Sequence, residues 1–496
     1  MEPPYVGCYG VYGKGRGEVF VEPSSGTERL FAHPPEPGAW PAAGMFVFLA
    51  LHLPLALAMK EARWVAGIHA LATFAFGLWL ALGRSRPGLT AQWLAYVVGA
   101  EVLWRMCHAP IPWQFAEYII CAVTAVLVVR ADAGSCRWLP GLYLGLLLPA
   151  CLIPLATLPF EEARQAISFN LAGPACLALC AIWCSCLPLT ATAFERLGFT
   201  LLGPVCGVGF LGFLGLATTE NDFSQNANFV ASGGYGPNQV SAVIGLGALF
   251  AVLLYLSENR SWLRRGLLAG VALGLLALSV LTFSRTGLYL FVPAVGVGAG
   301  FLLQAKGGLL RVLAPLAVLV AVAGASLPRL DAFTEGKLLE RFSDTGLTGR
   351  DTIALMEVQI WREHPVLGAG AGMSEYLRGG MGDARPPHTE YTRLLAEHGL
   401  PGAGAGLALL AMTARALFRA RGPWAKAMVS ALAVWALLFL AASAMRLAAP
   451  AFLLGLVQAR LRANEPATFS ATRPVRGRPV LDRLPRAWAA AHARER

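Results

Sequence analysis

Residues 327–399 read LPRLDAFTEGKLLERFSDTGLTGRDTIALMEVQIWREHPVLGAGAGMSEYLRGGMGDARPPHTEYTRLLAEHG. This is the longest polar interval between apolar runs, and the apolar blocks Leu309–Ser326 and Leu400–Leu417 flank it. A polar domain of this size, placed between two membrane-spanning segments, is where we expect the chemistry of the protein. It carries four side chains suited to catalysis or anion binding: Arg350, His364, Arg385 and His388.

The composition indicates a membrane protein. Of 496 residues, 56% are hydrophobic and only 14% are charged, whereas a soluble domain carries about 25% charged residues. Apolar runs near 20 residues recur along the chain, which is the length needed to cross roughly 30 Å of hydrocarbon. A transmembrane barrel would need strict alternation over about 10 residues, and runs such as LLAGVALGLLALSVL (267–281) lack it. We therefore predict an all-α polytopic protein.

The apolar runs predict about twelve to fourteen spans, the last two being nearly merged around Arg446. The predicted spans are 45–59, 64–82, 91–104, 113–130, 138–158, 166–190, 199–217, 239–256, 263–283, 286–303, 309–326, 400–418, 427–445 and 447–460. Residues 1–44 are polar and rich in Gly and Pro, and we expect them to be disordered. Met45 opens the first apolar run and is an alternative start.

The basic residues orient these spans. Lys and Arg are concentrated in alternate joints, such as 83–90, 130–137, 257–265, 305–311 and 419–426, and the positive-inside rule places such joints in the cytoplasm. Both termini then lie inside, with a basic cytoplasmic tail at 461–496, while the long loop lies outside. Residues 221–238, the FSRTG joint (283–287) and Arg446 fall on the same outer side. The net charge of +11 is explained by these joints, and no basic stripe interleaved with aromatics points to nucleic acid.

The loop has helical signals of its own. Residues 348–364 place apolar side chains on one helical face and end before Pro365. After the Gly-rich turn 368–372, a short helix is expected at 373–377, and a last helix from Thr389 to a Gly399 cap. The expected domain is small, helical and docked on the membrane surface.

Arg285 interrupts an apolar stretch, and a guanidinium at bilayer depth costs roughly 2.5–3.5 kcal/mol. It therefore needs a partner, and its planar fork of donors suits a diphosphate. The alternative is an arginine that extends to the membrane interface. The turn GGYGPNQ (233–239) ends in Asn238 and Gln239 at the start of a span, and its backbone amides are suited to an anion; a plain turn before a helix explains it equally well.

His388 follows two prolines and precedes Thr389, Glu390 and Tyr391. Histidine titrates near neutral pH, so His388 is a candidate general base, although a lone loop histidine is more often structural. His364 and His398 lie at helix ends, and no His pair has metal-ligand spacing. Cys176, Cys180 and Cys184 share one helical face, where we favour packing over a metal or redox cluster.

Taken together, three motifs resemble the superfamily of O-antigen ligases and Wzy-type polymerases, which are bacterial envelope glycosyltransferases. They are GGYGPN before a span, FSRTG between two spans, and GR…W.EHPVLGAG…HTEYTRLLAEHGLPG across the loop, from about Gly233 to Leu417. The resemblance implies a GT-C-like bundle in the inner membrane with a large periplasmic loop. It divides the chain into transmembrane helices at 45–326, a periplasmic domain at 327–399 and C-terminal transmembrane helices at 400–460.

The resemblance implies metal-independent transfer of glycan from undecaprenyl pyrophosphate to a glycan or lipid A-core hydroxyl, with inversion and without a cofactor. Arg285 would bind the diphosphate and His388 would activate the acceptor. Candidate substrate-binding residues are Arg350, Asn238, Gln239, Tyr391, Arg385 and Arg446. Two departures stand out: many ligases have an arginine shortly before the GGYGPN turn, where this chain has NANFVASGG, and HTE replaces the frequent His-Asn.

Several functions share this architecture. The sequence does not separate a ligase, a repeat-unit polymerase and an oligosaccharyltransferase acting on protein, and we favour the first two because the loop is modest. The alternative class is a flippase or transporter of lipid-linked glycan. Such transporters usually show internal repeats, and none is evident between the halves of this chain.

Overall fold

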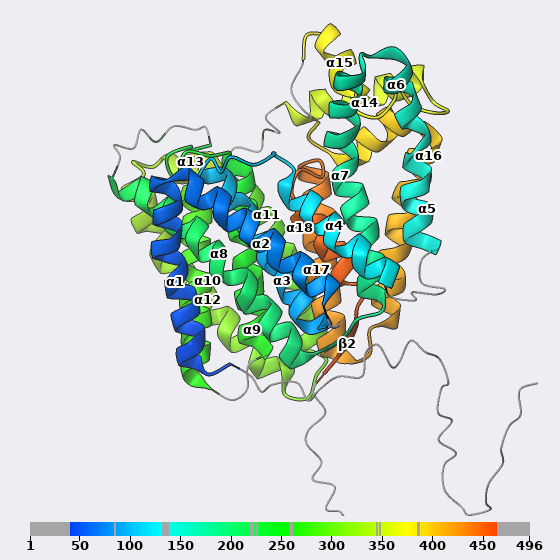
Figure 1. The fold of residues 1–496 in the computed structure, drawn as a ribbon. Coiled ribbons are helices and arrows are strands. Elements are labelled where there is room, and N and C mark those ends of the chain that lie inside the picture. Colours follow the sequence, from blue (N-terminus) through cyan, green and yellow to red (C-terminus); the bar gives the residue numbers. More distant parts are fainter. Residues whose placement is uncertain are drawn as a thin grey trace, which may run out of the picture.

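The computed structural model describes residues 40–83, 86–130, 138–218, 223, 227–257, 261–343, 346, 349–383 and 387–463. Helices make up nearly all of this part (Figure 1). The elements are α1 (Ala42–Glu61), α2 (Arg63–Leu82), α3 (Pro87–Met106), α4 (Phe115–Arg130), α5 (Trp138–Leu147), the 3-10 helix η3 (Pro149–Cys151), α6 (Leu152–Thr157), α7 (Phe160–Ser185), β1 (Pro188–Thr190), α8 (Ala191–Thr218), α9 (Pro237–Ser257), α10 (Trp262–Leu281), α11 (Thr286–Leu302), α12 (Gly308–Phe333), α13 (Lys337–Ser343), α14 (Arg350–Glu363), α15 (Met373–Gly380), α16 (Glu390–Arg419), α17 (Gly422–Ala442), α18 (Ala448–Leu456) and β2 (Arg460–Arg462).

The protein is a polytopic membrane protein, as the sequence predicts. Ten helices in the described part are long and apolar enough to cross a membrane: α1, α2, the run from α5 through α6, α7, α8, α9, α10, α12, α16 and α17. The predicted count of twelve to fourteen also included four shorter or more polar helices. Of these, α4, α11 and α18 have 16, 17 and 9 residues, and α3 carries Glu101 and Arg105 near its end.

The helices form two groups (Figure 1). Helices α5, α7, α14, α15 and α16 stand together on one side, and α1, α2, α3 and α8 to α12 form a wider bundle beside them. Among the ten long apolar helices, α8, α9 and α17 are the most buried, whereas α12 exposes most of its surface. An exposed apolar helix is expected where the solvent is lipid.

The end of the bundle that carries the basic joints is held by polar contacts. Arg264 pairs with Glu195, and the Trp424 indole donates to the Ser257 hydroxyl at 3.1 Å. β1 and β2 pair in parallel there, with Leu189 opposite Leu461. This small sheet is the one element type that the all-α prediction did not include.

The loop helices are close to those predicted. α14 and α15 cover the expected segments, and α14 ends one residue before His364. Gly399 interrupts α16 as predicted: its backbone is not helical (φ 57°, ψ −136°), so α16 consists of a loop-domain helix before Gly399 and a membrane-spanning helix after it, as far as Arg419. The loop domain and the next span therefore meet at a kink at Gly399.

α9 and α11 approach each other closely where α11 begins. A Cβ atom on Gly287 would lie 2.3 Å from the Ser279 hydroxyl oxygen and 2.4 Å from the Ser241 carbonyl oxygen. A Cβ on Gly245 of α9 would likewise lie 2.8 Å from the Gly287 carbonyl oxygen. Only glycine at 287 allows this contact, which fixes the position of the preceding Arg285.

We expect Gly287→Ala to lower the thermal stability of the purified protein, because overpacking of this kind costs about 1–3 kcal/mol. Gly296→Ala in the same helix is the matched control, since a Cβ there meets no atom within 4 Å and alanine favours helix. Melting temperatures in detergent would compare the two variants. Equal melting temperatures would contradict a tight α9–α11 contact.

Candidate functional site

The FSRTG turn is held rigidly against the start of α9. The Ser284 hydroxyl donates to Asn238 Oδ1 at 2.8 Å. The Ser241 hydroxyl donates to the Ser284 carbonyl at 3.1 Å and accepts from the Gly287 N–H at 3.0 Å. Ser241 and Ser284 are buried. The predicted residue Asn238 therefore positions the turn that carries Arg285.

Three arginines gather around this turn and form a cationic cluster, which we define as Arg285, Arg341 and Arg350. The Arg285 guanidinium donates to the Gly346 carbonyl at 2.6 Å, and Arg341 Nε donates to the Phe283 carbonyl at 3.1 Å. Burial lowers the pKa of Arg350, and the charges of Arg285 and Arg341 lower it further. Arg285 and Arg341 therefore both lie within electrostatic range of Arg350, and a bound dianion would stabilise the cluster.

His388 lies just before α16, in the segment Pro387–Thr389. Thr389 is the N-cap residue of α16, and its hydroxyl accepts from the Tyr391 N–H at 3.2 Å. The Pro387 carbonyl accepts a 2.5 Å hydrogen bond from the Arg446 guanidinium. His388 is half-buried between these two anchored residues, so the backbone on both sides of its ring is fixed.

Arg446 belongs to the non-helical segment between α17 and α18, which we name the α17–α18 break (Ser443–Leu447). Side chains satisfy the backbone of this break: Glu390 accepts from the Met445 N–H at 3.1 Å, and Arg105 donates to the Arg446 carbonyl at 2.9 Å. Glu101 accepts from the Ala448 N–H just beyond it, at 2.9 Å. A broken helix among membrane spans requires such partners.

Arg105, near the end of α3, connects the two halves of the site. The same Nη1 atom that binds the Arg446 carbonyl donates to Gln239 Oε1 at 3.0 Å. Gln239 Oε1 also accepts from the Tyr235 hydroxyl at 3.3 Å. A continuous chain of contacts thus runs from the His388 segment, through Arg446 and Arg105, to the GGYGPNQ turn and on to Arg285.

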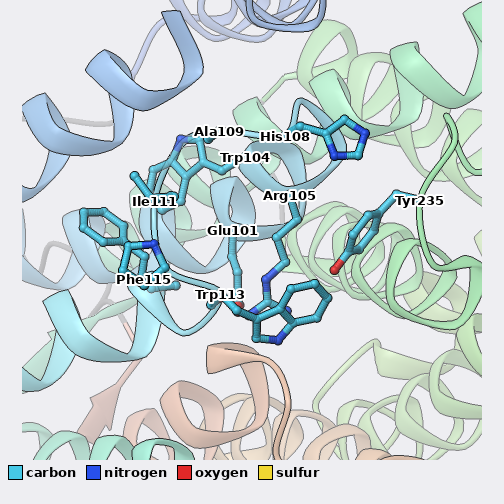
Figure 2. Close-up of a pocket in the computed structure, with 11 residues that line it drawn as sticks. Glu101, Trp104, Arg105, His108, Ala109, Ile111, Trp113, Phe115 and Tyr235 are labelled. Carbon is cyan, nitrogen blue, oxygen red and sulfur yellow. The ribbon is translucent and has the colours of Figure 1, made fainter. Parts of the chain in front are cut away.

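Arg105 is itself held by two buried carboxylates. It pairs with Glu101 at 2.6 Å and lies 3.8 Å from Glu117. Its guanidinium carbon lies 4.4 Å from the centre of the Trp113 ring. Figure 2 shows Arg105, Glu101 and Trp113 at a cavity, with Tyr235 pointing toward Arg105 from the opposite wall. The volume of this cavity is about 370 Å³. Burial raises the pKa of Tyr235 to about 12, so its hydroxyl stays a neutral donor.

A second buried polar network supports the loop domain beneath His388. Glu357 of α14 accepts from the Thr392 hydroxyl at 2.5 Å and lies 3.7 Å from Arg378. Arg393 donates to Glu397 at 2.8 Å and also pairs with Glu390. The network therefore links α14, α15 and α16 to the Glu390 carboxylate that binds the α17–α18 break.

The remaining predicted residues are placed as follows. The Tyr391 hydroxyl donates to the Leu437 carbonyl of α17 at 2.9 Å, a helix-packing contact. Arg385 lies outside the described residues. Cys176, Cys180 and Cys184 are buried among the helices. Within the described ranges, no group of three or more His, Cys, Asp or Glu side chains is arranged to hold a metal ion.

A known protein family matches the part of the chain that contains Arg285 and His388. Residues 271–407 match the family model Wzy_C, described as O-antigen ligase. The chain carries a domain of the O-antigen ligase family. The matched segment includes Arg285, Arg350 and His388, which confirms the family resemblance. No curated protein matches the chain.

Two residues of this site were not among the predicted ones. Arg341 follows an ordinary Leu-Leu-Glu stretch, and nothing in its spacing sets it apart from the other loop arginines. Arg105 lies outside the matched segment, 180 residues before Arg285. Its one sequence signal is its helical spacing to Glu101, a carboxylate inside the predicted span 91–104 that Arg105 directly follows. A charge inside a span is costly and marks function.

The pKa of Glu357 predicts a pH-dependent stability. Burial raises it from 4.5 to about 7, while the Thr392 hydrogen bond and Arg378 act in the opposite direction. Between these two pH values the folded state binds more protons than the unfolded state, so stability falls as pH rises from about 4.5 to about 7, by up to about 3 kcal/mol.

We expect Glu357→Gln to flatten this dependence in melting curves recorded between pH 5 and 8. The exposed Glu363 of the same helix is the control, because Glu363→Gln should keep the wild-type slope. If the melting temperature of Glu357→Gln changes with pH as steeply as that of the wild type, a group other than Glu357 causes the dependence.

Proposed function

We propose that this protein transfers a glycan from a polyprenyl diphosphate, undecaprenyl pyrophosphate in bacteria, to a hydroxyl group of an acceptor on the outer face of the inner membrane. One observation carries the proposal. The turn that bears the cationic cluster and the segment that bears His388 are joined by a chain of hydrogen bonds through Arg105 and Arg446. An anion site and a candidate base thus belong to one rigid assembly.

The reaction follows from the chemistry of these groups. His388 takes the proton of the acceptor hydroxyl while the oxygen attacks the anomeric carbon of the donor sugar. The bond between that carbon and the diphosphate oxygen breaks, with inversion, and polyprenyl diphosphate leaves with the bonding electrons. The cationic cluster stabilises the negative charge that grows on the leaving group. The step needs no metal when guanidinium groups supply the positive charge.

The cluster also accounts for the arginine that the sequence lacks before the GGYGPN turn. Arg350 of the loop lies within electrostatic range of Arg285, and Arg341 donates to the Phe283 carbonyl of the same turn, so the second cation would come from the loop rather than from residues 226–234. Asn238 holds the turn through Ser284, and Gln239 holds Arg105. We assign both a positioning role in diphosphate binding.

The first test is complementation of a deletion strain with Arg285→Ala and His388→Ala at matched expression. We expect each to lower transfer by about two to four orders of magnitude, so that surface polymer is lost and outward-facing lipid-linked glycan accumulates. Near-normal polymer from both variants would refute the site assignment. Single repeat units on the lipid would identify a polymerase, and stranded long chains a ligase.

Arg341 provides a sharper test, because the structure rather than the sequence motifs singles it out. We expect Arg341→Gln to raise the KM for the lipid-linked donor at least tenfold, a loss of about 1.4 kcal/mol, with little change in the KM for acceptor. Arg329→Gln is the control, since Arg329 is exposed and donates to Ala325 of its own helix. Equal donor KM values in the two variants would show that Arg341 does not bind the donor.

A further inference from the structure

A second, larger cavity lies beside the site and has no role in the mechanism above. Its volume is about 910 Å³, and it is enclosed by residues 112–118, by the outer end of α7 and by α15. Aromatic and polar side chains make up most of its walls, among them Tyr118, Phe169, Tyr376, Gln165, Asn170 and Glu375. We name this cavity the α7–α15 groove.

The wall chemistry of the α7–α15 groove fits a sugar chain better than a lipid or a diphosphate. Amides and a carboxylate supply donors and acceptors for hydroxyl groups, and aromatic rings supply flat apolar faces for the C–H faces of pyranoses. The one arginine in the lining, Arg164, is already paired with Glu161 at 2.5 Å. A polar lining of this kind does not favour an acyl chain, because the remaining donors and acceptors of these side chains would lose their contact with water.

Hydrogen bonds fix the walls of the groove. The Tyr118 hydroxyl bonds the Ser168 hydroxyl across from α4 to α7. Asn170 Nδ2 donates to the Ala166 carbonyl at 2.9 Å, and its Oδ1 accepts from Arg393 at 3.2 Å. Pre-formed walls of this kind lower the ordering cost of binding.

The groove is linked to the segment of the candidate base by hydrogen bonds. Asn170 on its wall accepts from Arg393 at 3.2 Å, and Arg393 pairs with Glu390, two residues after His388. Pro112 lines both this groove and the smaller cavity around Arg105.

We propose that the α7–α15 groove is the glycan-binding subsite of the enzyme and that it holds several sugar units of a neutral oligosaccharide beside His388. The proposal rests on the proposed glycan transfer. The same chemistry would recognise the acceptor chain or the sugar units of the donor, so the test separates these two sources. Tyr376, which is 49% exposed on α15, is the aromatic platform most open to a ligand.

The test uses the full chain in lipid nanodiscs and oligosaccharide released by mild acid from the host's own lipid-linked glycan. We expect saturable binding by the wild type, about tenfold weaker binding by Tyr376→Ala, and nearly full binding by Tyr376→Phe, which keeps the ring. Leu377→Ala is the control, because Leu377 is a neighbour in the same helix that does not line the groove. Absent binding by the wild type, or equal affinities in Tyr376→Ala and Leu377→Ala, would overturn the proposal.

His388→Ala separates this proposal from the proposed function. It should bind the oligosaccharide with wild-type affinity and transfer none of it. In transfer assays of Tyr376→Ala, a raised KM for acceptor alone would assign the groove to the acceptor glycan, and a raised KM for donor alone to the donor glycan. If the wild type binds the oligosaccharide through Tyr376 but transfers none of it, the proposed transferase function is refuted and the proposed glycan-binding groove is supported.

Discussion

The buried ion pair between Arg105 and Glu101 is the interaction on which the site depends. Removing charged groups from water costs several kcal/mol per ion. Here contacts with Glu117, with Gln239 and with backbone groups offset part of this cost. The pair binds the α17–α18 break on both sides, since Arg105 holds the Arg446 carbonyl and Glu101 the Ala448 N–H. A hydrophobic pair of similar volume would pack as well, but it would leave these backbone groups unsatisfied. We therefore interpret the charges as fixing one conformation of the break.

The α17–α18 break in turn fixes the position of the start of α16. Arg446 and Glu390 bind each other's segments reciprocally: Arg446 donates to Pro387, and Glu390 accepts from Met445. The start of α16 cannot shift without breaking both contacts, and the second part of α16 continues from the kink at Gly399 into the membrane. The loop domain is therefore a rigid extension of two spans, and His388 lies at the point where they meet.

Features of the fold and the site could be predicted where they depend on residues close together in the sequence. Membrane class, loop helices and the three motifs follow from local composition and spacing. Arg285 and His388 stood out because each is unusual in its local context. Arg341 and Arg105 did not, since their roles arise from contacts with Phe283 and Arg446 that are 58 and 341 residues away. The break in α16 at Gly399 could be predicted, because a glycine with positive φ usually ends a helix. The contacts there could not, because the Leu400 N–H donates to the Pro365 and Val366 carbonyls of a separate loop segment.

The match to the O-antigen ligase family covers both the turn of Arg285 and the segment of His388, but it does not cover the residues that hold them in place. Arg105, Gln239 and Arg446 all lie outside residues 271–407. A leaving-group site and a base are useful only at a fixed separation, because misplacement by about 1 Å can cost two orders of magnitude in rate. In the proposed reaction, the matched segment supplies the reactive groups on two elements, and the helices before and after it set the distance between those groups. The catalytic unit we propose is therefore the whole bundle, and the polar end of α3 is as much a part of it as the loop.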